Sequence, residues 1–176
     1  PLGFFLDEGF NALDSLNIRD GFYYPVFLTG NGGRESLFFY LLALSLSIFG
    51  DTIYAVRLIP ALFGALMVPC VFVLGRSLFN TKVGLFAAFS VTVSCWQLHY
   101  SRIGFRYILL PVFTTLVFWM FLQLFERRSY SWALSAGTIL GLGIYTYVPY
   151  RLFPFVIVFF LVHQLITRRA GLSHLW

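Results

Sequence analysis

Charged residues are scarce in this sequence, and acidic residues are the scarcest. Asp and Glu number 7 and Lys and Arg number 12, while 59% of all residues are hydrophobic and only 11% are charged. Glu126 is the only acid between positions 58 and 167. This composition excludes a soluble domain with a polar surface and is typical of a membrane protein.

Cysteine and the common catalytic motifs are also nearly absent. Cys70 and Cys95 lie inside apolar runs, where thiols behave as small hydrophobes and are not expected to pair or bind metal. His99, His163 and His174 are too scattered to form a cluster. We find no His and Cys spacing for a metal, no glycine-rich phosphate loop and no nucleophile elbow.

Long uncharged runs account for most of the chain. A helix needs about 20 apolar residues to cross a hydrocarbon layer of about 30 Å. We therefore expect an all-α, polytopic membrane helical bundle with about five spanning helices in residues 53–176. The predicted spans are residues 58–75, 83–100, 107–125, 129–150 and 152–167.

Residues 36–50 form a shorter uncharged run, for which an interfacial helix and a sixth crossing are both plausible. The distribution of Lys and Arg favours an interfacial helix, because the larger basic group then shares the cytoplasmic side. Residues 1–35, which mix charges with aromatic rings, are then an extracytoplasmic loop on the bilayer. The cytoplasmic group is Arg76, Lys82, Arg127, Arg128, Arg168 and Arg169.

The net charge of +5 does not indicate a nucleic-acid partner, because the basic residues are spread between apolar runs. Four arginines remain on the outer side, where the positive-inside rule disfavours them, and they could bind an anion such as an isoprenoid phosphate. Each could also be an interfacial anchor. Arg102 and Arg106 would share one helix face with His99, if the helix continues. The four are Arg57, Arg102, Arg106 and Arg151.

Two local patterns allow both a functional and a structural interpretation. Adjacent Asp7 and Glu8 could carry chemistry, or could simply favour the first turn of a helix. Tyr147 lies in a Tyr-rich segment before Arg151 that could present hydroxyls to a ligand or belong to an aromatic belt. The spacing of Gly137 and Gly141 predicts close helix packing.

Taken in order, several short motifs resemble the C-type-fold membrane glycosyltransferases of family 39, which include dolichyl-phosphate-mannose protein mannosyltransferases and aminoarabinose transferases. Asp7 and Glu8 resemble the family's Asp-Glu pair. The other matching strings are Ser-Leu-Phe-Phe-Tyr-Leu-Leu at 36–42, Phe-Gly at 49–50, Ala-Val-Arg-Leu-Ile-Pro at 55–60, Gly-Arg-Ser-Leu-Phe at 75–79 and Tyr-Ser-Arg-Ile at 100–103.

The resemblance implies an inverting transferase that moves a sugar from a polyprenyl-phosphate donor to a hydroxyl of a lipid, protein or glycan. Asp7 would be the general base, Glu8 would position it or bind the acceptor, and the arginines would hold the lipid phosphate. Arg34 and Glu35 stand where the family often has a basic residue before two prolines, so the acceptor is left open. We list Arg34, Glu35, Tyr147 and His99 as substrate-binding candidates.

The resemblance also predicts location and extent. We expect a multi-pass protein of the bacterial plasma membrane, with an outward-facing site and lipid around the helices, and a fragment lacking the family's first helix and C-terminal part. The sequence establishes no cofactor and leaves a divalent cation open, because Asp7 and Glu8 could hold Mg²⁺ or Mn²⁺. A transporter or flippase of lipid-linked saccharides and a non-catalytic assembly subunit are the alternatives.

Overall fold

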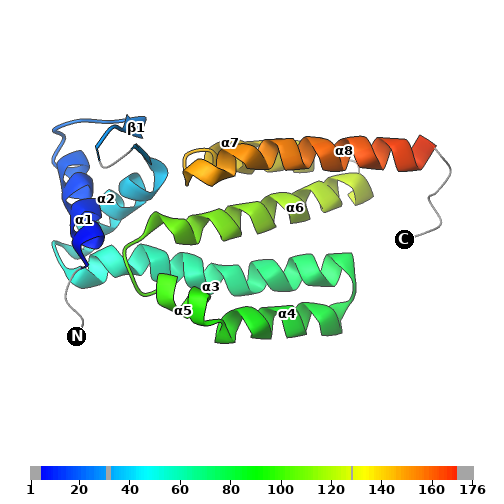
Figure 1. Cartoon of the computed structure of the whole chain (residues 1–176), viewed down its shortest axis with the longest axis horizontal. Helices are drawn as coiled ribbons and strands as arrows, with labels where there is room; N and C mark the ends of the chain where they lie inside the picture. Colours follow the sequence, from blue (N-terminus) through cyan, green and yellow to red (C-terminus); the bar gives the residue numbers. More distant parts are fainter. Residues whose placement is uncertain (1–4, 31–32, 128, 170–176) are drawn as a thin grey trace.

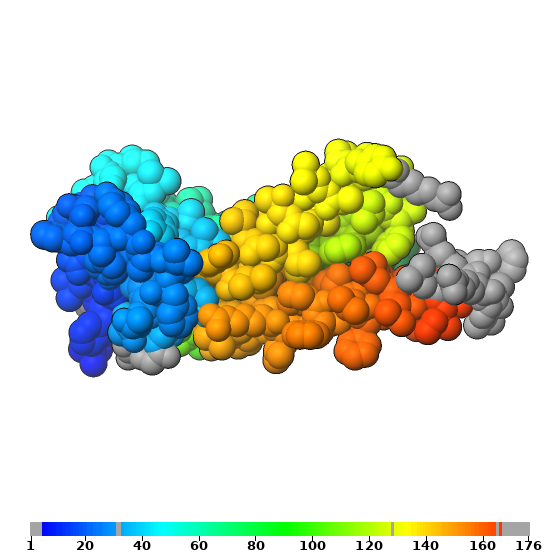
Figure 2. Space-filling model, turned by 90° about the horizontal axis from the view of Figure 1, so that it is seen from above, coloured from blue at the N-terminus to red at the C-terminus, as the bar shows by residue number. Residues whose placement is uncertain are grey.

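Residues 5–30, 33–127 and 129–169 are described by the computed structural model, and there the protein is an all-α helical bundle, as the sequence predicts. Long helices run side by side, and a smaller N-terminal block stands across one end of them (Figure 1). Seen from above, this block closes the same end of the molecule (Figure 2). The predicted basic residue Arg128 and residues 170–176 lie outside the described part.

The elements, in chain order, are α1 Leu6–Arg19, β1 Phe27–Leu28, β2 Arg34–Glu35, α2 Leu37–Phe49, α3 Ile53–Leu78, α4 Thr81–Val93, α5 Cys95–Tyr100, η1 Arg106–Ile108, α6 Leu109–Arg127, α7 Tyr130–Gly143, η2 Val148–Leu152 and α8 Phe153–Arg169.

The N-terminal block contains more regular structure than the predicted loop. Helix α1 forms because Ala12, Ser15 and Ile18 recur at helical spacing and give a buried face, which packs on α2. Strands β1 and β2 then pair antiparallel, with Phe27 opposite Glu35. The location of this block and of α2 relative to a bilayer remains a prediction.

Only some of the predicted spans are continuous helices in the structure. Helices Ile53–Leu78 and Arg106–Arg127 are long and apolar enough to cross a membrane, while Leu37–Phe49, Thr81–Val93 and Val148–Gln164 are apolar but shorter. Residues 83–100 do not form one continuous helix, because extended backbone at Ser94 separates α4 from α5, and a membrane crossing by this segment stays a prediction. The span predicted over residues 129–150 is also too long, since α7 ends at Gly143.

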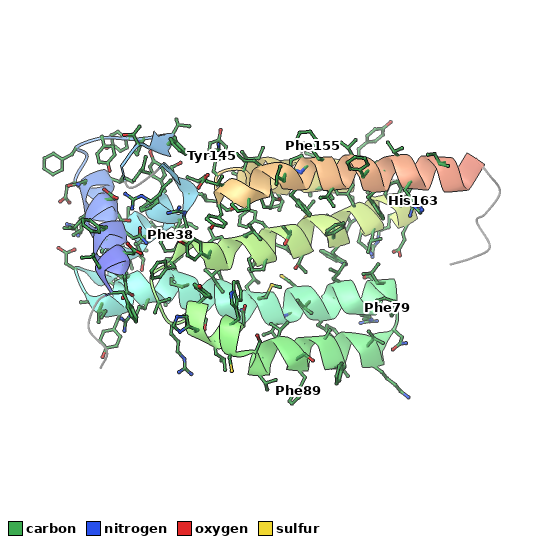
Figure 3. All side chains as sticks on the ribbon, in the orientation of Figure 1. Phe38, Phe79, Phe89, Tyr145, Phe155 and His163 are labelled. Atoms are coloured by element: carbon green, nitrogen blue, oxygen red, sulfur yellow. The ribbon has the colours of Figure 1, made fainter. Side chains whose placement is uncertain are left out.

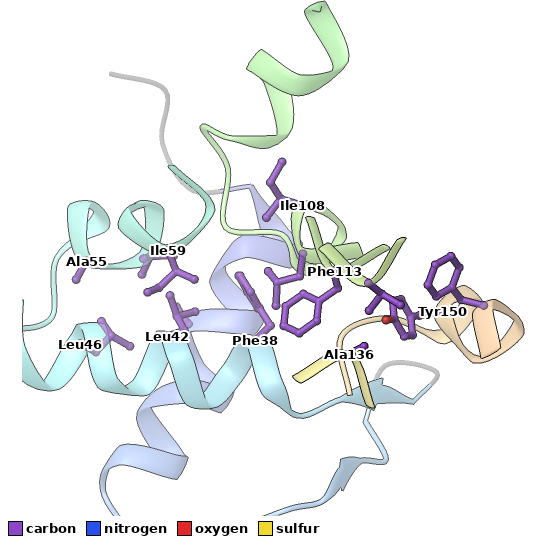
Figure 4. Packing of buried hydrophobic residues seen from close by; sticks show 14 of the residues in the cluster. Phe38, Leu42, Leu46, Ala55, Ile59, Ile108, Phe113, Ala136 and Tyr150 are labelled. Atoms are coloured by element: carbon purple, nitrogen blue, oxygen red, sulfur yellow. The ribbon is translucent and has the colours of Figure 1, made fainter. Parts of the chain in front are cut away.

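The main core lies where the N-terminal block meets the bundle. Phe38 and Leu42 of α2 are fully buried there against α3 and the start of α6 (Figure 4). Outward-facing apolar side chains cover the far surfaces of the bundle, and Phe89 and Phe155 point away from it (Figure 3). Such an exposed apolar surface suits lipid better than water.

The chain direction divides the predicted basic groups between the two ends of the bundle. Helix α3 begins beside the N-terminal block and ends at the opposite end, and α6 and α8 run the same way (Figure 1). Arg57 is therefore at the block end, whereas Arg76 and Arg127, in the last turns of α3 and α6, are at the other end. This division agrees with the predicted grouping of arginines and leaves the orientation in the membrane as a prediction.

The predicted close packing at Gly137 and Gly141 is wrong, because a Cβ added at either position would meet no atom within 4 Å. The tight glycine of α7 is Gly143. There an added Cβ would lie 2.1 Å from Cζ of Tyr150, whose side chain is buried.

Replacing Gly143 by Ala should therefore destabilise the protein, because the Tyr150 ring has no space into which it can move. Overpacking of this kind costs about 1 to 3 kcal/mol. Thermal unfolding in detergent should show a lower midpoint for Gly143→Ala. The matched control is Gly137→Ala in the same helix, which should be neutral or slightly stabilising. Equal midpoints for the two variants would contradict this packing.

Candidate active site

Glu8, in the first turn of α1, lies at the centre of the junction between the block and the bundle. Its side chain is fully buried, and Arg57 Nε and Nη2 donate to its two oxygens at 2.8 and 2.9 Å. The backbone N–H of Gly104 donates to Oε1 at 2.9 Å. Burial raises the pKa of Glu8, but these hydrogen bonds outweigh burial and lower it overall, so the carboxylate is ionised at neutral pH.

Both backbone polar groups of Gly104, its N–H and its carbonyl, are hydrogen-bonded to side chains of α1. Asn11 Nδ2 donates to its carbonyl at 2.9 Å, while Glu8 accepts from its N–H. A Cβ at this position would lie 2.8 Å from Val56 Cγ1 and 2.9 Å from Glu8 Cγ, so only glycine fits. The sequence analysis missed both Asn11 and Gly104. The one local signal was the spacing of Asn11 three residues after Glu8, which puts both on one face of a helix.

Arg34 extends this network on the side of α1 away from Arg57. It is buried, donates to Asn11 Oδ1 at 3.0 Å, and forms a short ion pair with Asp14. Its guanidinium also lies 5.0 Å from the centre of the Phe39 ring. These contacts give Arg34 a structural place in the block, where it also lines a cavity of about 280 Å³ formed by residues of the block.

Asp7 differs from Glu8 in both exposure and hydrogen bonding. Its side chain is exposed, and no hydrogen bond or ion pair of its carboxylate is found in the described part of the chain. Helical geometry explains the difference, because successive residues point about 100° apart. The Asp-Glu pair therefore contains one buried, paired carboxylate and one that is available to a ligand.

A cavity of about 310 Å³ opens beside the Glu8 and Arg57 pair, and its size is typical of ligand sites, which span about 300 to 1,000 Å³. It brings together Arg57, His99 and Arg102 from three separate segments. Phe5, the residue before α1 and two positions before Asp7, forms part of its wall. The remaining lining residues are Leu98 and Ile103. Basic side chains on an apolar wall can bind an anionic head group.

The predicted helix face shared by His99, Arg102 and Arg106 is wrong. Helix α5 ends at Tyr100, residues 101–105 are irregular, and Arg106 begins η1. The chain turns at this point because Glu8 and Asn11 hold the Gly104 peptide. Arg102 therefore reaches the basic cavity with His99, while Arg106 lies elsewhere.

Arg106 and Arg151 gather instead around Glu35, at the end of β2. Glu35 is only 1% exposed; Arg151 Nη2 lies 3.2 Å from its Oε1 and Arg106 Nε lies 3.8 Å from its Oε2. The guanidinium of Arg106 also lies over the rings of Tyr107 and Tyr147. The four outer arginines thus form two groups, one at each of two cavities.

A divalent cation does not fit the Asp7 and Glu8 pair in this arrangement, because both oxygens of Glu8 accept hydrogen bonds from Arg57. Across the described residues, no group of three or more His, Cys, Asp or Glu side chains could hold a metal ion. We therefore derive no step that passes through a metal.

The Glu8 and Arg57 pair should stabilise the fold. Glu8→Gln leaves Arg57 facing a neutral group, and breaking a buried pair costs about 3 to 5 kcal/mol. We expect a loss near the lower limit, because the Arg57 side chain is 24% exposed. Thermal unfolding in detergent should show a lower midpoint for Glu8→Gln and an unchanged one for Asp7→Asn in the same turn.

The pH dependence of this effect follows from the lowered pKa. Folding lowers the pKa of Glu8 below its ordinary value of 4.5, so its contribution is complete above that value and is lost as the pH falls through the lower folded value. The difference in unfolding midpoint between wild type and Glu8→Gln should shrink as the pH falls below 4.5 and through the lower folded value. A difference that stays constant into this acidic range would contradict the assignment.

Comparison with known proteins gives one match. The model of the dolichyl-phosphate-mannose-protein mannosyltransferase family matches residues 36–176, a range that includes Arg57, His99 and Arg102 but begins after Asp7, Glu8 and Glu35. A search of curated proteins and a search of solved structures found no match. The match covers most of the chain. The protein therefore belongs to the dolichyl-phosphate-mannose-protein mannosyltransferase family, that is, to the membrane glycosyltransferases of the mannosyltransferase type.

Proposed function

We propose that the full protein transfers a sugar from a polyprenyl-phosphate donor to a hydroxyl acceptor on the outer face of a bacterial plasma membrane. The observation that carries this proposal is the cavity that brings Arg57, His99 and Arg102 together and has Phe5 in its wall, two residues before the exposed Asp7. One side of the site thus offers a base and the other offers positive charge. Glycosyl transfer from a lipid phosphate needs both.

In this mechanism Asp7 removes the proton of the acceptor hydroxyl, and the oxygen attacks the anomeric carbon of the sugar. The bond between that carbon and the phosphate oxygen breaks as the new bond forms, which inverts the anomeric centre. The polyprenyl phosphate leaves with an additional negative charge. Arg102 and Arg57 stabilise this charge, because fixed guanidinium groups in an apolar cavity interact strongly with phosphate oxygens.

Glu8 acts in this proposal as a positioning residue. Its carboxylate holds Arg57 at the cavity and also fixes the Gly104 peptide, from which the chain leads back to Arg102 two residues earlier. Both phosphate-binding side chains thus depend on one buried carboxylate. Asp7, one position earlier in the same turn, is oriented by the same helix.

The first test of the proposed function concerns Asp7. A positioned general base contributes about a hundred- to ten-thousandfold to rate, so Asp7→Asn should lower the rate of transfer by that factor in membranes containing the full-length protein and radiolabelled polyprenyl-phosphate sugars. Asp20→Asn, which changes an exposed acid just after the other end of α1, is the control and should keep wild-type rates. Full transfer by Asp7→Asn would overturn the proposal.

The second test concerns the phosphate site. Arg102→Lys keeps the charge but loses the two parallel hydrogen bonds that a guanidinium can give to phosphate. One charge-assisted hydrogen bond is worth about 1.5 to 3 kcal/mol, so we expect the apparent donor KM to rise about ten- to a hundredfold. Arg76→Lys, in the last turn of α3, is the matched control. Unchanged donor kinetics in Arg102→Lys would mean that this side chain is only an interfacial anchor.

A further inference from the structure

The group around Glu35 contains two buried polar atoms without a hydrogen-bond partner in the described part of the chain. They are Glu35 Oε2 and Arg106 Nε, and they lie 3.8 Å apart. Buried charged groups are normally satisfied, because an unmade hydrogen bond inside a protein is costly. A gap of this size suits one inserted oxygen, since an oxygen at about 2.8 Å from each atom bridges it.

The inserted group must be able to donate and accept hydrogen bonds at the same time. It has to donate to the Glu35 carboxylate and accept from the Arg106 guanidinium, which has no acceptor of its own. A hydroxyl does both. A deprotonated phosphate or carboxylate oxygen cannot donate to Glu35, and an ammonium or guanidinium group cannot accept from Arg106, so the group at this position is neutral.

A cavity of about 340 Å³ lies on the same carboxylate, within the range of about 300 to 1,000 Å³ typical of ligand sites. Val26 and Phe27 of the N-terminal block form one wall, and Ile144 and Tyr145 of the turn after α7 form the other. Figure 3 shows Tyr145 at the place where this turn meets the block. Aromatic and aliphatic walls around a few convergent polar groups suit the apolar face and hydroxyl edge of a sugar ring.

Access to the carboxylate is controlled by Arg151. Its side chain is 51% exposed and lines the cavity, whereas the Glu35 side chain that it contacts is 1% exposed. The guanidinium of Arg151 also lies 5.6 Å from the centre of the Phe27 ring at the cavity wall. Arg151 is thus the exposed contact of an otherwise buried carboxylate, on the side of the cavity.

We propose that Glu35, Arg106 and Arg151, with the walls formed by Phe27 and Tyr145, bind the hydroxyl groups of a neutral sugar. This proposal rests on the proposed function in one respect, because the sugar would belong to the donor or to a glycan acceptor. Glu35 accepts a hydrogen bond from a sugar hydroxyl, and Arg106 donates one to the same oxygen. The site is a second one, separate from the basic cavity that contains Arg102.

The test is direct binding of methyl α-mannoside to the full-length protein in detergent, measured by saturation-transfer NMR. Wild type should give a saturable signal, and Glu35→Gln should weaken binding about tenfold or more, as expected for a hydrogen bond to a charged group. Tyr145→Ala is the second variant. Its ring is 43% exposed, so its removal should reduce binding without affecting folding.

Tyr54→Ala is the matched control, because Tyr54 is 83% exposed and lines neither cavity; it should bind the mannoside as wild type does. The proposal is overturned if wild type gives no signal, or if the signal is the same in Glu35→Gln and Tyr145→Ala as in wild type. The second result would mean that a bridging water alone completes the Glu35 group.

The outcome is separable from that of the proposed function. Asp7→Asn should bind the mannoside normally, since Asp7 is not part of this site. A mannoside signal that depends on Glu35, in a protein that performs no transfer from polyprenyl-phosphate sugars, would support the site and refute the proposed function. Steady-state kinetics of Tyr145→Ala then identifies the source of the sugar, because the KM that rises is that of the donor or that of the acceptor.

Discussion

The buried contact between Glu8 and Arg57 is the interaction on which the rest of this structure depends. It joins α1 to α3 through two charged hydrogen bonds, and the same carboxylate fixes the Gly104 peptide between α5 and α6. In an apolar surrounding, an ionised pair is tolerated only when its hydrogen bonds are satisfied, and here they are. These hydrogen bonds offset the free-energy cost of burying the charges, and they fix the geometry at this end of the bundle.

The two cavities at the block end share a physical principle but differ in charge. At the first, Arg57 is paired with Glu8, and the exposed Arg102 adds a positive charge without an acidic partner in the cavity wall. At the second, Glu35 faces two arginines at longer distances, so its hydrogen bonding is incomplete. A satisfied carboxylate supports the fold, whereas one with an unsatisfied buried oxygen leaves a specific position for a ligand atom.

The sequence predicted what depends on local pattern. Apolar runs located the bundle, the Lys and Arg distribution grouped Arg57 apart from Arg76, and the isolated acids pointed to Asp7 and Glu8. It could not predict that Glu8 and Gly104, separated by 96 positions, would be joined, because nothing near either residue encodes the other. The sequence analysis also missed the break at Ser94 and the tight contact of Gly143 with Tyr150, which depends on the turn that follows α7.

Residues 101–105 form a short connection whose position is fixed by hydrogen bonds to α1. Arg102 lies near its start and Arg106 follows its end, and the Gly104 peptide between them is bonded on both sides to α1. If the two cavities bind the ligands proposed above, a short segment fixed in this way sets the distance between the phosphate and the sugar hydroxyl. Discrimination among lipid-linked sugars would then depend on length: a molecule whose head group and ring are separated by the wrong distance can satisfy one cavity but never both together.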